Sequence, residues 1–237
     1  MMNPQITLMY DSASRPNLVE QSLQTLQRHM KYSGETIWIF HEAELFPDES
    51  AKCVHIAKYS GIFDKIVKSK PRGQGMSIGN ILKECKTEYF IHFEDDHICL
   101  RDIPLDDIVG VMETNHKINQ IAFNKRVTVP IVAGWPKKEI KSGNFTLTTS
   151  PHWRYTPAIW RMDYIKPRWV DFPNSDNSHW EIQRVLKKNA KEERPDANWI
   201  IENLGTYYWG KIGEPAYVKN IGKGLSNRAI GINYERN

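Results

Sequence analysis

Short apolar segments alternate with amphipathic helical stretches along the first half of the chain, and this alternation constrains the fold more than any other feature. The apolar segments are rich in β-branched and aromatic residues, as strands buried inside a sheet are. We expect strands at Ile6–Tyr10, Thr36–Phe40, Asp64–Lys68, Tyr89–Phe93 and Gln120–Phe123. We expect helices at Pro16–His29, Glu49–Tyr59, Ser77–Lys86 and Leu105–Thr114. This order predicts an α/β fold, a mostly parallel sheet flanked by helices.

The first helix has the clearest boundary signals. Pro16 suits the first turn of a helix, and Ser14 before it is a residue type that caps helices. A single face of the helix carries the residues expected to be buried. These residues are Leu18, Val19, Ser22, Leu23 and Leu26.

The residue pattern changes after Phe123. Residues 125–153 mix β-branched residues with proline and glycine and show no helical period, which indicates an inserted hairpin or excursion. Regular structure is expected again at Pro157–Ile165 and in a helix at Ser178–Ala190. Because no linker or repeat marks a boundary, we predict one domain over residues 1–237, with a front half at 1–123 and a back half at 124–237.

Three acidic residues, Glu94, Asp95 and Asp96, come directly after the buried strand at 89–93. In α/β sheets, ligands bind outside the carboxyl ends of the strands. Residues two apart in an extended segment face the same side, so Glu94 and Asp96 present their carboxylates together and Asp95 points elsewhere. Paired hard oxygen ligands suit Mg²⁺ or Mn²⁺. Strand-end acids also form turns and caps, but three adjacent like charges favour a functional role.

Composition narrows the class of protein further. No apolar run approaches the ~20 residues of a membrane-spanning helix, and residues 1–10 lack the pattern of a secretory signal. The three cysteines, Cys53, Cys85 and Cys99, form no zinc or redox motif, so we expect buried free thiols. A reducing cytoplasm fits these features best.

The strand and acidic cluster, Tyr-Phe-Ile-His-Phe-Glu-Asp-Asp, resemble the acidic motif of GT-A glycosyltransferases. The resemblance is greatest to the inverting enzymes of the large family 2, which includes many bacterial and phage transferases. Four further stretches resemble family motifs in the same order along the chain. They are residues 10–16, 72–80, 157–163 and 217–222.

The resemblance implies a metal site built from Glu94, Asp96 and the closing motif at 217–222. The family usually offers a histidine in that motif, whereas this chain has Asn220. An amide oxygen binds a hard cation more weakly than a charged ligand does. The third protein ligand is therefore Asn220, with His97 or a water molecule as the alternatives.

The resemblance also implies a nucleotide-sugar donor, most simply a UDP-sugar, bound by the front half. The arginines and lysine near the strand ends can pair with its diphosphate, and glycines allow close approach of the backbone. A carboxylate past the second strand can accept hydrogen bonds from uracil or ribose. The residues assigned to the donor are Tyr10, Asp11, Arg15, Glu42, Lys70, Arg72, Gly75 and Asp95.

By the same resemblance, Glu181 is the catalytic base that deprotonates the acceptor hydroxyl, so that in-line attack inverts the anomeric carbon. Glu181 also completes a capping box that begins at Ser178, which is its structural alternative. Asp176 is the competing base.

Basic and aromatic residues interleave through the back half, from Lys125 to Arg194, and seven of the eight tryptophans lie there. Such a surface suits DNA, whose hydroxymethylated pyrimidines are acceptors of phage enzymes of this broad kind. It also suits an anionic glycolipid at a membrane surface, so a lipopolysaccharide or other surface glycan is the alternative acceptor. A phage enzyme of this kind would work in the host cytoplasm. The alternative to a binding surface is a structural one, in which the tryptophans are part of the hydrophobic core.

Two other classes stay open. A catalytically inactive module that binds a nucleotide or sugar would carry the same motifs. A nucleotidyltransferase also combines an α/β sheet with acidic pairs, but no glycine-rich triphosphate-binding signature follows the first strand.

Overall fold

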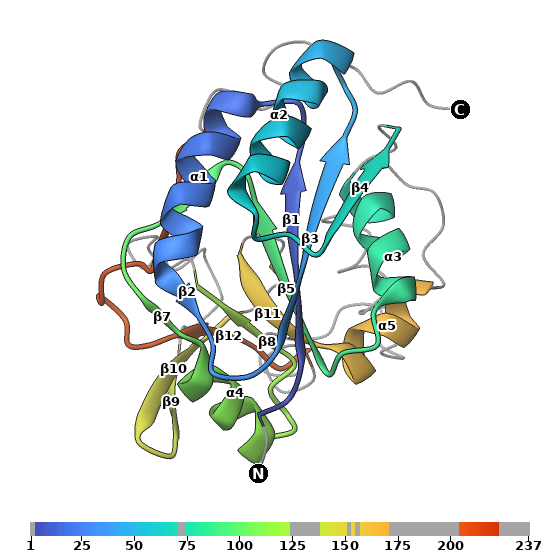
Figure 1. Ribbon diagram of the computed structural model, residues 1–237. Coiled ribbons are helices and arrows are strands. Elements are labelled where there is room, and N and C mark those ends of the chain that lie inside the picture. Colours follow the sequence, from blue (N-terminus) through green and yellow to red (C-terminus); the bar gives the residue numbers. More distant parts are fainter. Residues whose placement is uncertain are drawn as a thin grey trace, which may run out of the picture.

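The computed structural model describes residues 3–70, 74–123, 138–150, 153–154, 157–170 and 204–222. Within these residues a nine-stranded sheet forms the middle layer of the molecule, and helices pack on both of its faces (Figure 1). The predicted fold class, an α/β sheet flanked by helices, is confirmed.

Four parallel strands, in the order β4-β3-β1-β5, make up one half of the sheet. In the register of these strands, Asp11 lies opposite both His41 and Glu94. Polar residues at the carboxyl ends of β1, β3 and β5 therefore lie side by side, and we call this end of the parallel strands the carboxyl edge of the sheet. The four parallel strands of this half are β1 (Ile6–Ser12), β3 (Thr36–Ala43), β4 (Lys65–Ser69) and β5 (Tyr89–Glu94).

The other half of the sheet is mixed, because β11 inserts antiparallel between β5 and β8. Next to β8, β12 runs parallel, and a β9–β10 hairpin closes the edge. Part of the excursion expected after Phe123 is this hairpin, while residues 124–137 lie outside the described part. The strands are β8 (Gln120–Ala122), β9 (Glu139–Ser142), β10 (Phe145–Thr149), β11 (Ala158–Arg161) and β12 (Thr206–Trp209).

Two apolar cores lie on opposite faces of the sheet. One is covered by α1 (Pro16–His29), α2 (Pro47–Ser60) and α4 (Leu105–Thr114). The other is covered by α3 (Gln74–Glu84) and α5 (Met162–Val170). The buried face of α1 is the predicted one, since its buried residues are the five expected from the helical period.

Short strands attach two distant segments to this framework. The strand β13 (Val218–Asn220) pairs antiparallel with β6 (His97–Cys99), so that Asn220 lies opposite His97. The strand β2 (Met30–Lys31) pairs in parallel with β7 (Ile103–Pro104). The first of these pairings brings the closing motif to the acidic cluster.

The prediction that Ser14 caps α1 is wrong. The helix begins after Arg15, and no side chain forms a capping hydrogen bond there. Ser14 instead bonds to Glu42 and to the loop that follows β3. A tertiary contact has taken the hydroxyl that the local pattern assigned to the helix.

Three tryptophans of the back half, Trp153, Trp160 and Trp209, belong to the core. Trp153 and Trp160 are buried and pack edge-on against each other, and Trp209 is buried beside Phe145. The three cysteines are buried and free, as predicted. Among the described residues, no helix combines the length and apolar character needed to cross a bilayer.

Candidate active site and metal centre

The acidic cluster lies at the carboxyl end of β5, where the chain turns into β6. Glu94 is the last residue of β5 itself, one residue further than the sequence predicted. Each of Glu94, Asp96 and His97 contributes one oxygen or nitrogen atom to a group in which all such atoms lie within 4.8 Å of one another. The spacing is that of side chains that can share one ion.

Contacts inside this cluster are short but poorly aligned for hydrogen bonding. His97 Nδ1 lies 2.7 Å from Asp96 Oδ1 and 3.4 Å from Glu94 Oε2. Asp96 Oδ1 and His97 Nδ1 are nevertheless both buried without an aligned hydrogen bond. Buried polar atoms normally find partners, and atoms left in this state are a place for an ion. Two carboxylates and an imidazole fit a Mn²⁺ or Mg²⁺ ion.

The charge state of Asp96 suits this role. Burial raises the pKa of its carboxyl, but the close contact and charge of His97, together with the charge of Arg15 and the hydrogen bond from Asn220, outweigh burial. The pKa therefore lies below the ordinary value for aspartate. A carboxyl group that stays ionised is a ready ligand for a hard cation.

Asn220, assigned to the metal by resemblance, does reach the cluster. Its amide nitrogen donates a hydrogen bond to Asp96 Oδ2 at 3.0 Å and lies 3.5 Å from His97 Nε2. Rotation of an asparagine amide by half a turn exchanges its nitrogen and oxygen, so either can face the cluster. The side chain can therefore donate to Asp96 or offer an oxygen to an ion.

The residues after Asn220 hold Asp96 from the other side. The Ile221 amide donates to the Asp96 carbonyl at 2.7 Å. A Cβ atom at Gly222 would come within 2.5 Å of the Asp96 Cβ, so only glycine fits there without a shift. The closing motif therefore fixes the position of Asp96.

Asp95, the middle acid, points away from this cluster, as the spacing predicts. It is fully buried and paired with Arg15, which contacts both of its oxygens. Burial raises the pKa of Asp95 to about 7, and the charge and hydrogen bonds of Arg15 lower it only in part. Arg15 Nη1 also lies 4.0 Å from Asp96 Oδ2. The arginine assigned to the diphosphate thus borders the cluster while it is bonded to Asp95.

Asp11 is the centre of a second polar network, on the same edge of the sheet. His41 Nδ1 donates to its carboxylate at 2.7 Å, and His92 Nε2 lies 3.6 Å away. On its other side, His41 Nε2 lies 2.9 Å from the Ser69 hydroxyl. Burial raises the pKa of Asp11, but hydrogen bonds and charge from the two histidines hold it well below the ordinary value.

Glu42 is fully buried and serves the framework in this structure. One of its oxygens accepts hydrogen bonds from the Ser14 amide and hydroxyl at 2.8 and 3.0 Å. Burial raises the pKa of the carboxyl, and these hydrogen bonds offset only part of that effect. Ser14 has a φ of 55°, a left-handed conformation that a serine adopts only when its surroundings hold it.

The other residues assigned to the donor are less informative. The Tyr10 ring is fully buried and stacks between Phe40 and Phe93, so its side chain belongs to the core and not to a ligand surface. Lys70 is exposed just after β4, and Gly75 lies in the first turn of α3. The assigned residues that lie outside the described part are Arg72, Asp176 and Glu181.

Sequence reasoning did not single out His41, His92 and Ser69 as functional residues. The signal that could have found them is a polar residue within or at the end of a strand that is otherwise apolar. The sequence pointed to His97 only as an alternative metal ligand. It is buried within the group of Glu94, Asp96 and His97, which we call the metal-type cluster.

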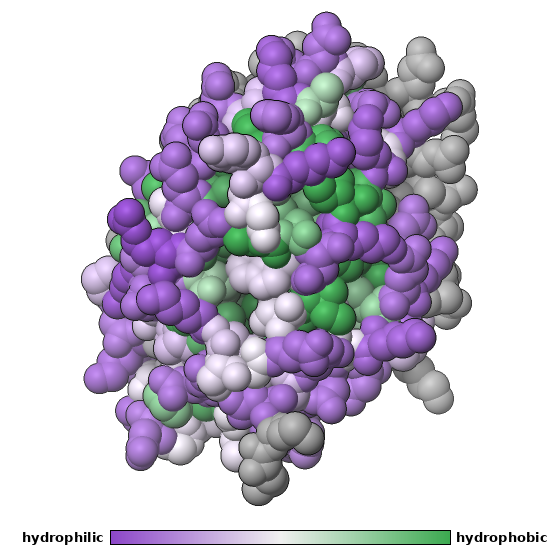
Figure 2. All heavy atoms as spheres, in the orientation of Figure 1, coloured by the Kyte–Doolittle hydropathy of each residue, from purple (hydrophilic) through white to green (hydrophobic). Residues whose placement is uncertain are grey.

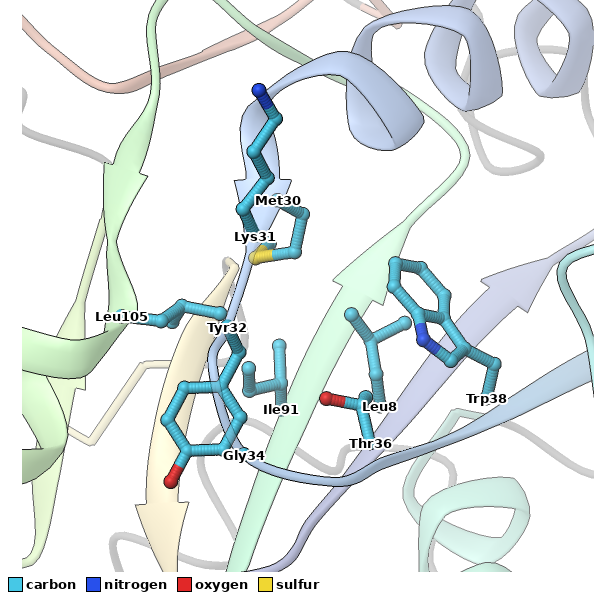
Figure 3. Close-up of a pocket in the computed structure, with 9 residues that line it drawn as sticks. All are labelled: Leu8, Met30, Lys31, Tyr32, Gly34, Thr36, Trp38, Ile91 and Leu105. Atoms are coloured by element: carbon cyan, nitrogen blue, oxygen red, sulfur yellow. The ribbon is translucent and has the colours of Figure 1, made fainter. Parts of the chain in front are cut away.

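A separate cavity lies on the opposite side of the sheet from these networks. Hydrophilic side chains cover most of the α1–α2 face, with apolar ones visible between them (Figure 2). Among these residues is a cavity of about 350 Å³, floored by Leu8 and Ile91 and walled by Tyr32 and Trp38 (Figure 3). The cavity contains none of the predicted site residues.

No protein-family model matches the sequence, and a search of curated proteins finds no match. Solved structures do match. One is mannosyltransferase PcManGT from Pyrobaculum calidifontis in complex with GDP-Man and Mn²⁺, with a TM-score of 0.56 and 10% identity. A second is S. aureus TarS 1–349 in complex with UDP, with a TM-score of 0.59 and 14% identity.

A third matching structure is CMP:2-keto-3-deoxy-manno-octonic acid synthetase in complex with CTP, with a TM-score of 0.51 and 10% identity. The match covers 95% of this chain and 97% of the synthetase. The matches to PcManGT and TarS cover 92% and 90% of this chain but only 59% of each of those chains. The chain therefore spans about three fifths of their length.

These likenesses show the fold. The chain has a GT-A type of α/β fold, as the resemblance of its acidic motif implied. These three structures hold ligands with guanine, uracil and cytosine bases. The fold alone therefore leaves both the reaction and the nucleotide open, and the side chains of this chain must carry those arguments.

Proposed function

We propose that the protein is a metal-dependent glycosyltransferase that moves a sugar from a nucleotide-sugar diphosphate to a hydroxyl acceptor. One observation carries the proposal. On a GT-A sheet, Glu94, Asp96 and His97 gather their ligand atoms within 4.8 Å at the carboxyl end of β5, and Asn220 closes on them from β13. This is where α/β sheets of this type bind ligands.

Glu94, Asp96, His97 and Asn220 would hold the Mn²⁺ or Mg²⁺ ion. When bound, such an ion neutralises the charge that develops on a departing diphosphate. The protein contributes an ionised Asp96 and a fixed position for it, because the closing motif packs against that side chain. Arg15 lies at the border of the cluster and supplies a positive charge toward the same edge.

Inversion at the anomeric carbon is the stereochemistry that we propose, with Glu181 as the base and Asp176 as its competitor. Both assignments rest on the resemblance to inverting family 2 enzymes. The halves of the chain keep their proposed roles, with residues 1–123 binding the donor and residues 124–237 the acceptor. A UDP-sugar remains the proposed donor, and the TarS complex with UDP supports it.

For the acceptor, we propose a hydroxymethylated pyrimidine of DNA, with a surface glycan as the alternative. The basic composition of the back half supports an anionic acceptor, and Lys138 and Lys141 are exposed. Trp153, Trp160 and Arg161, however, are buried and cannot touch a nucleic acid surface. Fewer residues are therefore free for DNA than the sequence suggested.

A nucleotidyltransferase is a second candidate, and a specific observation favours it. The synthetase in complex with CTP matches this chain over 97% of its own length. A nucleotidyltransferase would release pyrophosphate from a nucleoside triphosphate, whereas a glycosyltransferase would release a nucleotide from a nucleotide-sugar. A coupled pyrophosphate assay with each triphosphate therefore separates these two reactions.

The experiment that tests the proposal is a thermal-unfolding screen of UDP-, GDP- and CMP-sugars, each with and without Mn²⁺. A ligand that binds the native state raises the unfolding midpoint by mass action, so the true donor should do so only when Mn²⁺ is present. Slow hydrolysis of that donor by the pure protein would then distinguish an enzyme from a binding module. If no nucleotide-sugar shifts the midpoint, the proposal fails.

A further inference from the structure

The network around Asp11 ends in a hydroxyl group at the donor edge of the sheet. Because side chains alternate between the faces of a strand, Asp11, His41, Ser69 and Glu94 all point to the α3 face. They lie at the carboxyl ends of four neighbouring strands. The polar row therefore runs along the sheet edge, from Ser69 on β4 to the metal-type cluster after β5.

The length of this row suits a nucleotide. Three strand spacings separate β4 from β5, which amounts to about 14 Å. An extended nucleoside diphosphate with its phosphates at Asp96 can therefore bring its base close to Ser69. Ser69 is half-buried, so part of it stays accessible to a ligand.

Hydrogen-bond direction in the network determines what Ser69 can offer. Asp11 accepts from His41 Nδ1 at 2.7 Å, which fixes the proton of a neutral imidazole on that nitrogen. In that neutral form His41 Nε2 accepts, so the Ser69 hydroxyl at 2.9 Å donates to it. The hydroxyl proton is used internally, and only the lone pairs of Ser69 Oγ remain for a ligand.

We infer that Ser69, oriented by His41 and Asp11, selects a nucleobase whose ring edge offers an N–H, as uracil does, against cytosine. Cytosine presents a lone pair at the ring position where uracil presents an N–H, so it would face the lone pairs of Ser69. Two facing acceptors leave both unsatisfied, which costs binding free energy. The inference rests on the proposed function, since it needs a nucleotide at this edge.

Calorimetric titration of the intact protein with UDP and with CDP, both in Mn²⁺, tests the inference. The wild-type protein should bind UDP about tenfold more tightly than CDP, the effect of one mismatched hydrogen bond. Ser69→Ala should reduce that ratio to about two or less, mainly by weakening UDP. Ser69→Thr keeps the hydroxyl and should keep the ratio.

A variant of the orienting residue gives a sharper result. In His41→Leu the Ser69 hydroxyl is free to donate outward, so CDP should gain affinity relative to UDP. A purely structural role for His41 would weaken both nucleotides equally. Ser60→Ala is the matched control, because the Ser60 hydroxyl bonds to its own helix at the end of α2.

The outcomes separate this inference from the proposed function. If the wild-type protein binds neither UDP nor CDP while a thermal shift shows it folded, the nucleotide site and the inference both fail. If both bind and Ser69→Ala keeps the wild-type ratio, the proposed function stands and the inference fails. Where His41→Leu does not fold, the two Ser69 variants alone decide.

Discussion

Two groups of carboxylates share the carboxyl edge of the sheet, and they differ in how their oxygens are satisfied. In the network group, Asp11 is bonded to His41, Glu42 to Ser14 and Asp95 to Arg15. In the metal-type group, the buried Oδ1 atom of Asp96 lies beside His97 without an aligned hydrogen bond. Carboxylates thus belong to a hydrogen-bonded framework in one place and to a crowded set of ligand atoms in the other, although the second oxygen of Glu42 is also buried without an aligned partner.

The difference teaches how to distinguish structural acids from functional ones. A buried carboxylate with strong donors is already stabilised and has little to gain from a ligand. Buried ligand atoms that crowd together without an aligned hydrogen bond, as Asp96 Oδ1 and His97 Nδ1 do, have free energy to gain from a cation. Substitutions in the first group should therefore change stability, and those in the second should change metal binding.

The largest effect is expected for Asp96→Ala. Removal of a central ligand should weaken Mn²⁺ binding at least about a hundredfold, since even residues behind the ligands contribute ten- to hundredfold. Stability without metal should change little. Titration calorimetry with Mn²⁺ measures the loss, and Asp102→Ala is the control because its side chain is 72% exposed. Unchanged Mn²⁺ affinity would remove Asp96 from the metal site.

Ser14→Ala tests the network group. The hydroxyl donates to Glu42 and accepts from the Leu45 and Phe46 amides at 3.1 and 3.2 Å. Its loss leaves buried polar groups unsatisfied, so the free energy of unfolding should fall by about 2 kcal/mol. Urea denaturation checks this value, with Ser60→Ala as the control. Equal stability of the two variants would show that Ser14 has no role in joining the loops.

Gly222→Ala tests metal binding without removing a ligand, because it acts through the position of Asp96. The added Cβ would lie 2.5 Å from the Asp96 Cβ, so the Asp96 side chain must move. Mn²⁺ affinity should fall about tenfold, as for other residues that position ligands. Gly110→Ala is the control, since nothing lies within 4 Å of its Cβ position. If both variants bind Mn²⁺ equally well, the closing motif does not position Asp96.

The smallest effect is a change in acid stability in Asp11→Asn. The folded-state pKa of Asp11 lies below the unfolded value, so Asp11 stabilises the fold above about pH 4 and loses this contribution as pH falls through the folded pKa. The variant should therefore show a flatter fall in stability below about pH 4. Urea midpoints between pH 2 and 6 measure the slope, with exposed Asp107→Asn as the control. An unchanged slope would contradict the network.

Local patterns predicted the elements of the front half well. The helix α4 has the bounds expected, and the period of α1 identified its buried face. The position of β11 between β5 and β8 could not be predicted, because strand order depends on pairing partners distant in sequence. Ser14 was misread for a related reason, since its partner Glu42 is 28 residues away.

The candidate site likewise contains contacts between sequence neighbours, which could be predicted, and contacts between residues distant in sequence, which could not. Glu94 and Asp96 are near neighbours, so their convergence follows from the local backbone. Asn220 is 124 residues from Asp96, and only the resemblance to a family motif pointed to it. The pairing of His41 with Asp11 and Ser69 follows from strand register, which the sequence does not show.

The pairing of β13 with β6 has a consequence for synthesis of the chain. Asn220 follows its partner His97 by 123 residues, which a ribosome adds in roughly 6 to 25 s. The parallel strands can assemble during that interval, because all four precede residue 95. A nascent chain can therefore pair its four parallel strands well before its cation-binding centre is complete, and a chain halted before residue 218 would lack the Asn220 side chain that closes on that centre.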